Sequence, residues 1–119
     1  MGDYSKENKI SRAYSQDMEG GTLVKQDGSD EFTPTTGVND AFTGPLLEDG
    51  EQGISKPALL RGKISYVKAD AGVSAGDKLM PSGTNNGHVN THAAGGETEV
   101  GFAITGASAD GDGILAVIR

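Results

Sequence analysis

The chain of 119 residues contains no cysteine and no tryptophan, and aromatic residues make up only 5% of it. Without cysteine there is no disulfide framework, no thiol nucleophile and no cysteine-ligated zinc. No apolar run approaches the roughly 20 residues of a membrane-spanning helix. The start of the chain, MGDYSKENKISR, lacks the apolar stretch of a secretory signal. We therefore expect neither a membrane protein nor an exported one.

Large apolar residues are scarce, because Leu, Ile, Val and Phe together number only 23. A chain of this length corresponds to one domain that can bury about 65% of its unfolded surface. With 19 glycines and a net charge of −7, the composition lies near the border with disorder. The sequence thus predicts a small, turn-rich domain with a thin core that gains stability from partners.

The negative charge is confined to one part of the chain. Residues 1–53 hold 11 acidic and 4 basic residues, whereas residues 54–119 hold 6 of each. The low pI of 4.6 argues against binding nucleic acid through its phosphates. The stretch 27–53 contains seven acidic residues and no basic one. It is either a solvated face that keeps the protein soluble or a surface that meets a basic partner or cations.

Short strands between glycine-rich turns are the main pattern after residue 20. In the segment 99–105, Val100, Phe102 and Ile104 share one face and small residues form the other, so we expect a close neighbour there. The apolar run 114–118 is typical of a strand covered on both faces, in a barrel or a subunit interface. With no convincing long helix, the pattern predicts an all-β fold, a small β-barrel or β-sandwich-like domain. The other expected strands lie at 22–26, 31–33, 63–68 and 78–80.

Residues 1–20 are polar and end at two glycines. Ile10, Tyr14 and Met18 recur at four-residue spacing, which suits a short helix, but no apolar face is continuous. We interpret this segment as an extended N-terminal arm, with a floppy terminus as the alternative. The predicted organisation is an arm over residues 1–20 followed by a single β-rich domain over residues 21–119.

Candidate catalytic and metal-binding patterns are weak throughout. His88 and His92 would lie roughly 13 Å apart in an extended strand, too far to share a metal, so we expect exposed loop histidines. The Asp/Gly runs at 27–31 and 110–113 lack the glutamate of a calcium loop and fit turn chemistry. The GFAITG segment at 101–106 lacks the lysine of a phosphate-binding loop. We therefore predict no enzyme activity, no metal and no cofactor.

Four motifs in the second half occur together: VSAGDKL at 73–79, VGFAI at 100–104, ASADGD at 107–112 and the terminal ILAVIR. With them, residues 58–119 resemble the small capsid decoration, or cement, proteins of tailed, phage-like viruses. The resemblance implies a structural protein that is made in the host cytoplasm and binds the outer surface of an expanded capsid. Its partners would be the major capsid protein and further copies of itself in a homotrimer, with no nucleic acid or membrane involved.

Contact residues follow from this hypothesis. An extended N-terminal segment can add main-chain hydrogen bonds to a sheet edge of the shell protein, with Tyr4, Ile10 and Tyr14 as anchors. The apolar last strand supplies the candidate subunit contacts Ile114, Leu115, Val117 and Ile118. Two alternatives stay open: a small β-domain subunit of a virion tail, baseplate or fibre, and a carbohydrate-binding module. The latter needs an exposed aromatic platform, for which this chain has few residues.

Overall fold

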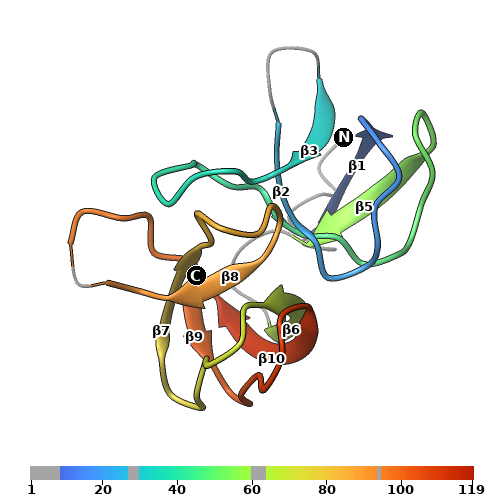
Figure 1. The fold of residues 1–119 in the computed structure, drawn as a ribbon. Helices are drawn as coiled ribbons and strands as arrows, with labels where there is room; N and C mark the ends of the chain where they lie inside the picture. The colour runs from blue at the N-terminus through green and yellow to red at the C-terminus, as the bar shows by residue number, and fades with distance from the viewer. Residues whose placement is uncertain (1–8, 27–29, 60–63, 94) are drawn as a thin grey trace.

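A computed structural model describes residues 9–26, 30–59, 64–93 and 95–119 (Figure 1). These residues form strands joined by turns and loops, with no helix among them, and no span in these ranges qualifies as a membrane-crossing helix. The all-β prediction is confirmed. The strands are β1 (Lys9–Tyr14), β2 (Leu23–Gln26), β3 (Glu31–Pro34), β4 (Gly44–Pro45), β5 (Ser55–Leu59), β6 (Ile64–Ala69), β7 (Lys78–Pro81), β8 (Val89–Thr91), β9 (Gly101–Ala103) and β10 (Asp112–Ile118).

The strands form two sheets that follow each other along the chain (Figure 1). The first sheet has the order β4-β2-β3-β1-β5, and β6 to β10 close into a barrel with the order β10-β6-β8-β7-β9. Closure leaves the barrel no free edge strand. The sequence left barrel and sandwich open, and the second half of the chain adopts the barrel.

The barrel core is built from inward side chains that alternate along each strand. In β10, Ile114, Ala116 and Ile118 are fully buried, while the residues between them are only partly covered. Val67 of β6 and Leu79 of β7 complete the same core. A strand places alternate residues on opposite faces, so the apolar run at 114–118 lies in a barrel wall, one of the environments that its composition predicted.

Strand β9 turns its small residues inward. Gly101 and Ala103 are buried, whereas Phe102 and Ile104 are each 39% exposed. The close neighbour expected at the small face is β10, because a Cβ added at Gly101 would lie 1.7 Å from the carbonyl oxygen of Val117. The glycine therefore lets β9 and β10 pair, with Phe102 of β9 and the following Ile104 on the outside of the barrel.

The predicted extended arm over residues 1–20 is corrected at residues 9–14, which form strand β1 of the first sheet. This strand pairs antiparallel with β5 from Lys9 to Ala13 and parallel with β3 at Ala13 and Tyr14. Tyr14 is fully buried, with its ring 6.5 Å from that of Phe32 in the core of the first sheet. The partner strands come from later in the chain, so the local sequence did not show that this polar segment would be held in a sheet. Residues 1–8 lie outside the described residues.

Backbone hydrogen bonds join the two sheets. Gly21 accepts from the amide of Lys68 in the barrel at 2.9 Å, and the amide of Leu23 donates to the carbonyl of Gly87 at 2.7 Å. The Leu23 side chain packs in the barrel core, although Leu23 belongs to strand β2 of the first sheet. The junction thus holds both sheets in a fixed relation.

Candidate interaction surfaces

The predicted N-terminal anchors have different locations. Tyr4 lies outside the described residues. Ile10 is half-buried and packs against the core of the first sheet. Tyr14 is part of that core, and its hydroxyl donates a hydrogen bond to the carbonyl of Glu48 at 2.8 Å. The prediction that Tyr14 contacts a partner is therefore wrong, because the folded chain covers this side chain completely.

The predicted subunit contacts in β10 divide by strand alternation. Ile114 and Ile118 are fully buried inside the barrel and are unavailable to a second subunit, which corrects that part of the prediction. Leu115 and Val117 have the opposite orientation and are partly exposed on the outer wall. Only these two of the four residues can contribute to an interface.

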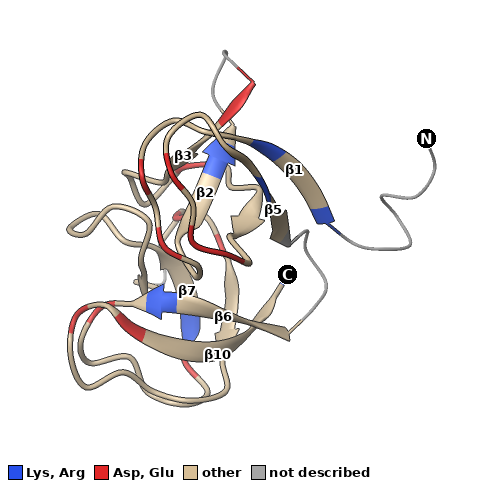
Figure 2. Ribbon diagram, turned by 90° about the vertical axis from the view of Figure 1, so that its right-hand side faces the viewer, with Lys and Arg blue, Asp and Glu red and all other residues tan. Residues whose placement is uncertain are grey.

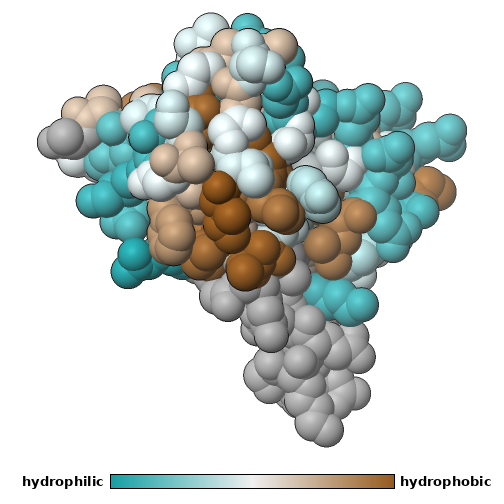
Figure 3. All heavy atoms as spheres, turned by 90° about the horizontal axis from the view of Figure 1, so that it is seen from below, coloured by the Kyte–Doolittle hydropathy of each residue, from teal (hydrophilic) through white to brown (hydrophobic). Residues whose placement is uncertain are grey.

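Leu115 and Val117 belong to a larger apolar surface, here called the outer apolar face. It consists of the outward side chains of three neighbouring strands and the residue after β9: Ile64, Tyr66, Phe102, Ile104, Leu115 and Val117. Figure 3 views the molecule from the barrel side, and hydrophobic side chains gather in the middle of this view with hydrophilic ones at its sides. Four of the six residues are large hydrophobic side chains with at least 39% of their surface exposed.

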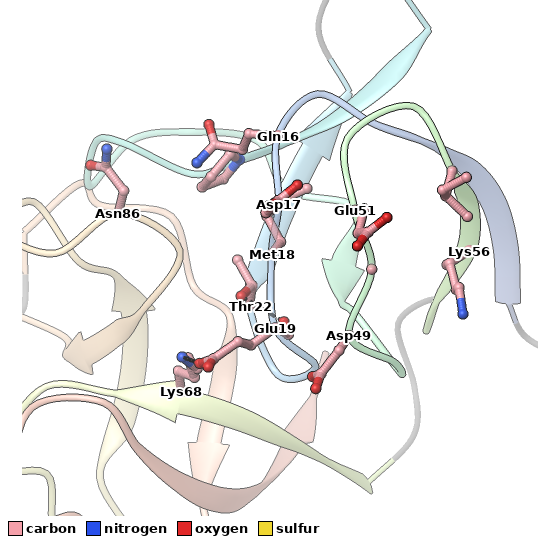
Figure 4. Close-up of a pocket in the computed structure, with 13 residues that line it drawn as sticks. Gln16, Asp17, Met18, Glu19, Thr22, Asp49, Glu51, Lys56, Lys68 and Asn86 are labelled. Atoms are coloured by element: carbon pink, nitrogen blue, oxygen red, sulfur yellow. Dashed lines mark hydrogen bonds and ion pairs between the residues drawn. The ribbon is translucent and has the colours of Figure 1, made fainter.

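A hollow, here called the inter-sheet groove, lies where the first sheet meets the barrel (Figure 4). It has a volume of about 690 Å³, and its walls come from residues 16–19 and 49–51, with Lys68 of β6 on the barrel side. Four carboxylates line it: Asp17, Glu19, Asp49 and Glu51. Two of them belong to the acidic stretch 27–53, which in this part is exposed to solvent.

Three of the groove carboxylates have partners inside the protein. Asp17 accepts from the amide of Gln52 at 2.9 Å, and Asp49 accepts from the amide of Gly20 at 2.7 Å. Glu19 forms an ion pair with Lys68 (Figure 4). Within the described ranges, no group of three or more His, Asp or Glu side chains is arranged to hold a metal ion. Asp17 and Asp49 fasten loops within the first-sheet half of the chain, and Glu19 joins that half to the barrel.

Asp70 is the centre of a nearly buried polar network at the end of β6. It is 5% exposed and accepts hydrogen bonds from Ser82 Oγ at 2.5 Å and Asn85 Nδ2 at 2.8 Å. His88 Nδ1 lies 3.0 Å from the same carboxylate. Ser82 contacts the carboxylate rather than the imidazole, so the arrangement does not activate the hydroxyl as a nucleophile in the manner of a triad. The network fixes the loop between β7 and β8.

The two histidines are less exposed than the sequence predicted. The side chain of His88 is 16% exposed, and that of His92 is 9% exposed. Nε2 of His92 lies 3.0 Å from the carbonyl oxygen of Glu97. The prediction of exposed loop histidines is wrong, because each imidazole has a polar partner that only the fold brings into reach.

The Asp/Gly run at 110–113 forms a turn, as its composition predicted, whereas residues 27–29 of the run at 27–31 lie outside the described residues. Asp112 Oδ2 accepts from the amides of Ser108 and Ala109 at 2.9 and 3.0 Å, and these hydrogen bonds lower the pKa of Asp112. Asp77 accepts from the amide of Ser74 at 2.8 Å in the same manner. The aspartates of the segments 73–79 and 107–112 therefore have a structural role in this chain.

Comparisons with solved structures show a similar fold. No family model matches the chain, and no curated protein matches it. A solved structure, the N base of the head fibre protein gp8.5 of bacteriophage phi29, superposes with a TM-score of 0.66 at 17% sequence identity. The superposition covers 93% of this chain and 92% of that one. The similarity therefore includes both sheets and is one of fold.

Sequence reasoning named two of the six residues of the outer apolar face, Leu115 and Val117, as contacts and missed the other four. The alternation around Phe102 and Ile104 was visible, but the sequence does not say which side of a strand faces the core when the other side carries glycine and alanine. Ile64 and Tyr66 alternate with Ser65 and Val67 in the same way. A pairing of these three strands would have revealed a continuous face, and that pairing is a property of the closed barrel.

Proposed function

We propose that this chain is a virion structural protein of a tailed, phage-like virus and binds the outer surface of the capsid. The observation that carries the proposal is the superposition over nine-tenths of both chains on the base of a phage head fibre. The resemblance of residues 58–119 to decoration proteins supports the same location and comes from the sequence alone. The proposed role is binding, with the major capsid protein as partner and with neither a reaction nor a cofactor.

Two forms of this role differ in what the protein does on the shell. As a decoration protein it would strengthen the expanded capsid, and self-association into a homotrimer would increase its contact area. As a fibre base it would anchor a further appendage and need not strengthen the shell. The motif resemblance favours the first form and the fold similarity favours the second. Tyr4 and Ile10 stay proposed shell contacts in both.

Co-sedimentation tests the proposal directly. Purified protein is mixed with compact precursor shells and with expanded shells of the virus that encodes it, and the bound protein is measured across a range of concentrations. Saturable binding to expanded shells is the expected result. Absence of binding to either kind of shell would remove the capsid role and favour a tail or carbohydrate-binding module.

A second measurement separates the two forms. Expanded shells with and without saturating protein are heated, and release of packaged DNA is followed with a dye. A decoration protein raises the release temperature because it binds the intact shell and not the ruptured one. A fibre base that only anchors an appendage leaves the release temperature unchanged while still binding at saturation.

A further inference from the structure

We propose that the outer apolar face binds a second copy of this chain, so that β6, β9 and β10 form the subunit interface of a homo-oligomer. This extends the self-association that is part of the proposed function and assigns it to residues. Two of its members, Leu115 and Val117, were candidates from the sequence. Ile64, Tyr66, Phe102 and Ile104 are new and come from the barrel geometry.

The face is continuous because the strand register places its side chains in rows. In one row, Val117 of β10 lies between Ile64 of β6 and Phe102 of β9. In the next row, Leu115 is paired with Tyr66, and the amide of Ile104 donates to the Leu115 carbonyl at 2.8 Å. Directly opposite side chains on paired strands lie about 5 Å apart. The six side chains therefore form one surface rather than isolated exposed residues.

The size of the face suits the centre of a protein interface. Ile64 and Tyr66 are each 62% exposed, and Phe102 and Ile104 are each 39% exposed, which together equals about two fully exposed large side chains. At roughly 200 Å² for such a side chain, the four present about 400 Å² of apolar surface. A standard interface covers about 800 Å² per partner, with an apolar core inside a polar rim.

The distribution of charge favours a second copy as the occupant. None of the six residues is charged, and the nearest charged side chains in the rows are basic: Lys78, paired with Phe102, and Lys68, two residues beyond Tyr66. The whole net charge of −7 belongs to residues 1–53, most of which form the first sheet and its loops. Figure 2 shows β10 red only at its start, while red segments are common in the loops of the first sheet. Copies joined through their barrels keep the acidic parts apart, which reduces like-charge repulsion.

Lysine substitutions on the face provide the test. Tyr66→Lys and Phe102→Lys place a charge in the centre of the proposed interface, and Leu47→Lys is the matched control. Leu47 is 41% exposed, close to the 39% of Phe102, and lies on the loop before β5 in the first-sheet half. Each substitution changes the net charge from −7 to −6, so a general reduction in repulsion acts equally in all three. Molar mass is measured by sedimentation velocity over a wide range of protein concentrations, and thermal melts confirm folding.

We expect the wild-type protein and Leu47→Lys to form the same oligomer. The two variants on the face should dissociate with a dissociation constant at least ~10-fold higher, the loss expected when a central interface residue is replaced. A wild-type protein that is monomeric at every concentration would overturn the inference. Dissociation of Leu47→Lys to the same extent as Tyr66→Lys would overturn it as well.

The proposed function and this inference can fail separately. If the monomeric protein still sediments with expanded shells and Tyr66→Lys weakens that binding, the face contacts the shell protein and the self-interface is refuted. If the protein forms an oligomer through the face but binds no shell, the interface stands and the capsid role is refuted. An unstable Tyr66→Lys variant is replaced by Tyr66→Ser, for which the same loss of association is expected.

Discussion

Replacing Gly101 by alanine should open the barrel. The backbone φ of Gly101 is 154°, and an added Cβ would lie 1.7 Å from the Val117 carbonyl oxygen and 2.8 Å from its carbon. Real Cβ contacts are essentially never shorter than 3.0 Å, so β9 and β10 must separate by more than 1 Å. Strand β9 connects β10 to β7, and its displacement therefore breaks the closure of the barrel.

The cost follows from the interactions that this separation weakens. Three residue pairs join β9 to β10, and the amide of Arg119 donates to the Val100 carbonyl beside them at 2.8 Å. Weakening two backbone hydrogen bonds costs about 2 kcal/mol, and an alanine forced into a glycine conformation adds about 2 kcal/mol. We expect a loss of roughly 4 kcal/mol, a large part of the 5–15 kcal/mol that stabilise a typical domain.

Two other glycines separate the clash from backbone strain. Gly72 has φ of 92° and open space around its Cβ position, so Gly72→Ala has the strain without the clash and should cost about 2 kcal/mol. Gly96 has open space and no positive φ, so Gly96→Ala should stay within about 0.5 kcal/mol of wild type. Urea denaturation followed by circular dichroism measures all three. If Gly101→Ala is no more than about 1 kcal/mol less stable than Gly72→Ala, the steric argument is refuted.

Three further predictions concern buried or hydrogen-bonded polar groups. Tyr14→Phe removes the hydroxyl that donates to the Glu48 carbonyl and should cost about 1 kcal/mol. Burial, and then the charges of Glu48 and Asp49, raise the pKa of Tyr14 to about 12, so the absorbance titration of wild type should show an ionisation near pH 12 that the variant lacks. The stability of the wild-type protein should fall as the pH rises above about 10, where the unfolded chain begins to lose this proton. Hydrogen bonds from the amides of Ala109 and Ser108 lower the pKa of Asp112, so this carboxylate stabilises the fold above pH ~4 and less as the pH falls, and thermal melts of Asp112→Asn should lose less stability on acidification than those of wild type. Asp70→Ala leaves the Ser82 and Asn85 donors unsatisfied and should cost about 3 kcal/mol in urea denaturation, whereas a cost below about 1 kcal/mol would show that water replaces the carboxylate.

The sequence by itself determined the elements whose signal is local. Glycine and aspartate at 73–79 and 107–112 predict turns, because Asp side chains accept hydrogen bonds from nearby amides and glycine adopts the required angles. The structure has these hydrogen bonds at Asp77 and Asp112. The alternation of large and small residues predicted a close neighbour at Gly101, and β10 is that neighbour. The predicted shared face was wrong for Val100, which is fully buried while Phe102 and Ile104 are exposed. The all-β class followed from the spacing of such elements.

Tertiary structure alone decided which surfaces remain exposed. Residues 9–14 became a strand because β3 and β5, from distant parts of the chain, provide hydrogen bonds that a polar segment cannot provide for itself. The same kind of long-range pairing buried Tyr14 and brought Phe102, Val117 and Ile64 into one row on the barrel. Local sequence sets the alternation of a strand, but which of its two faces meets the core depends on which strands pair beside it.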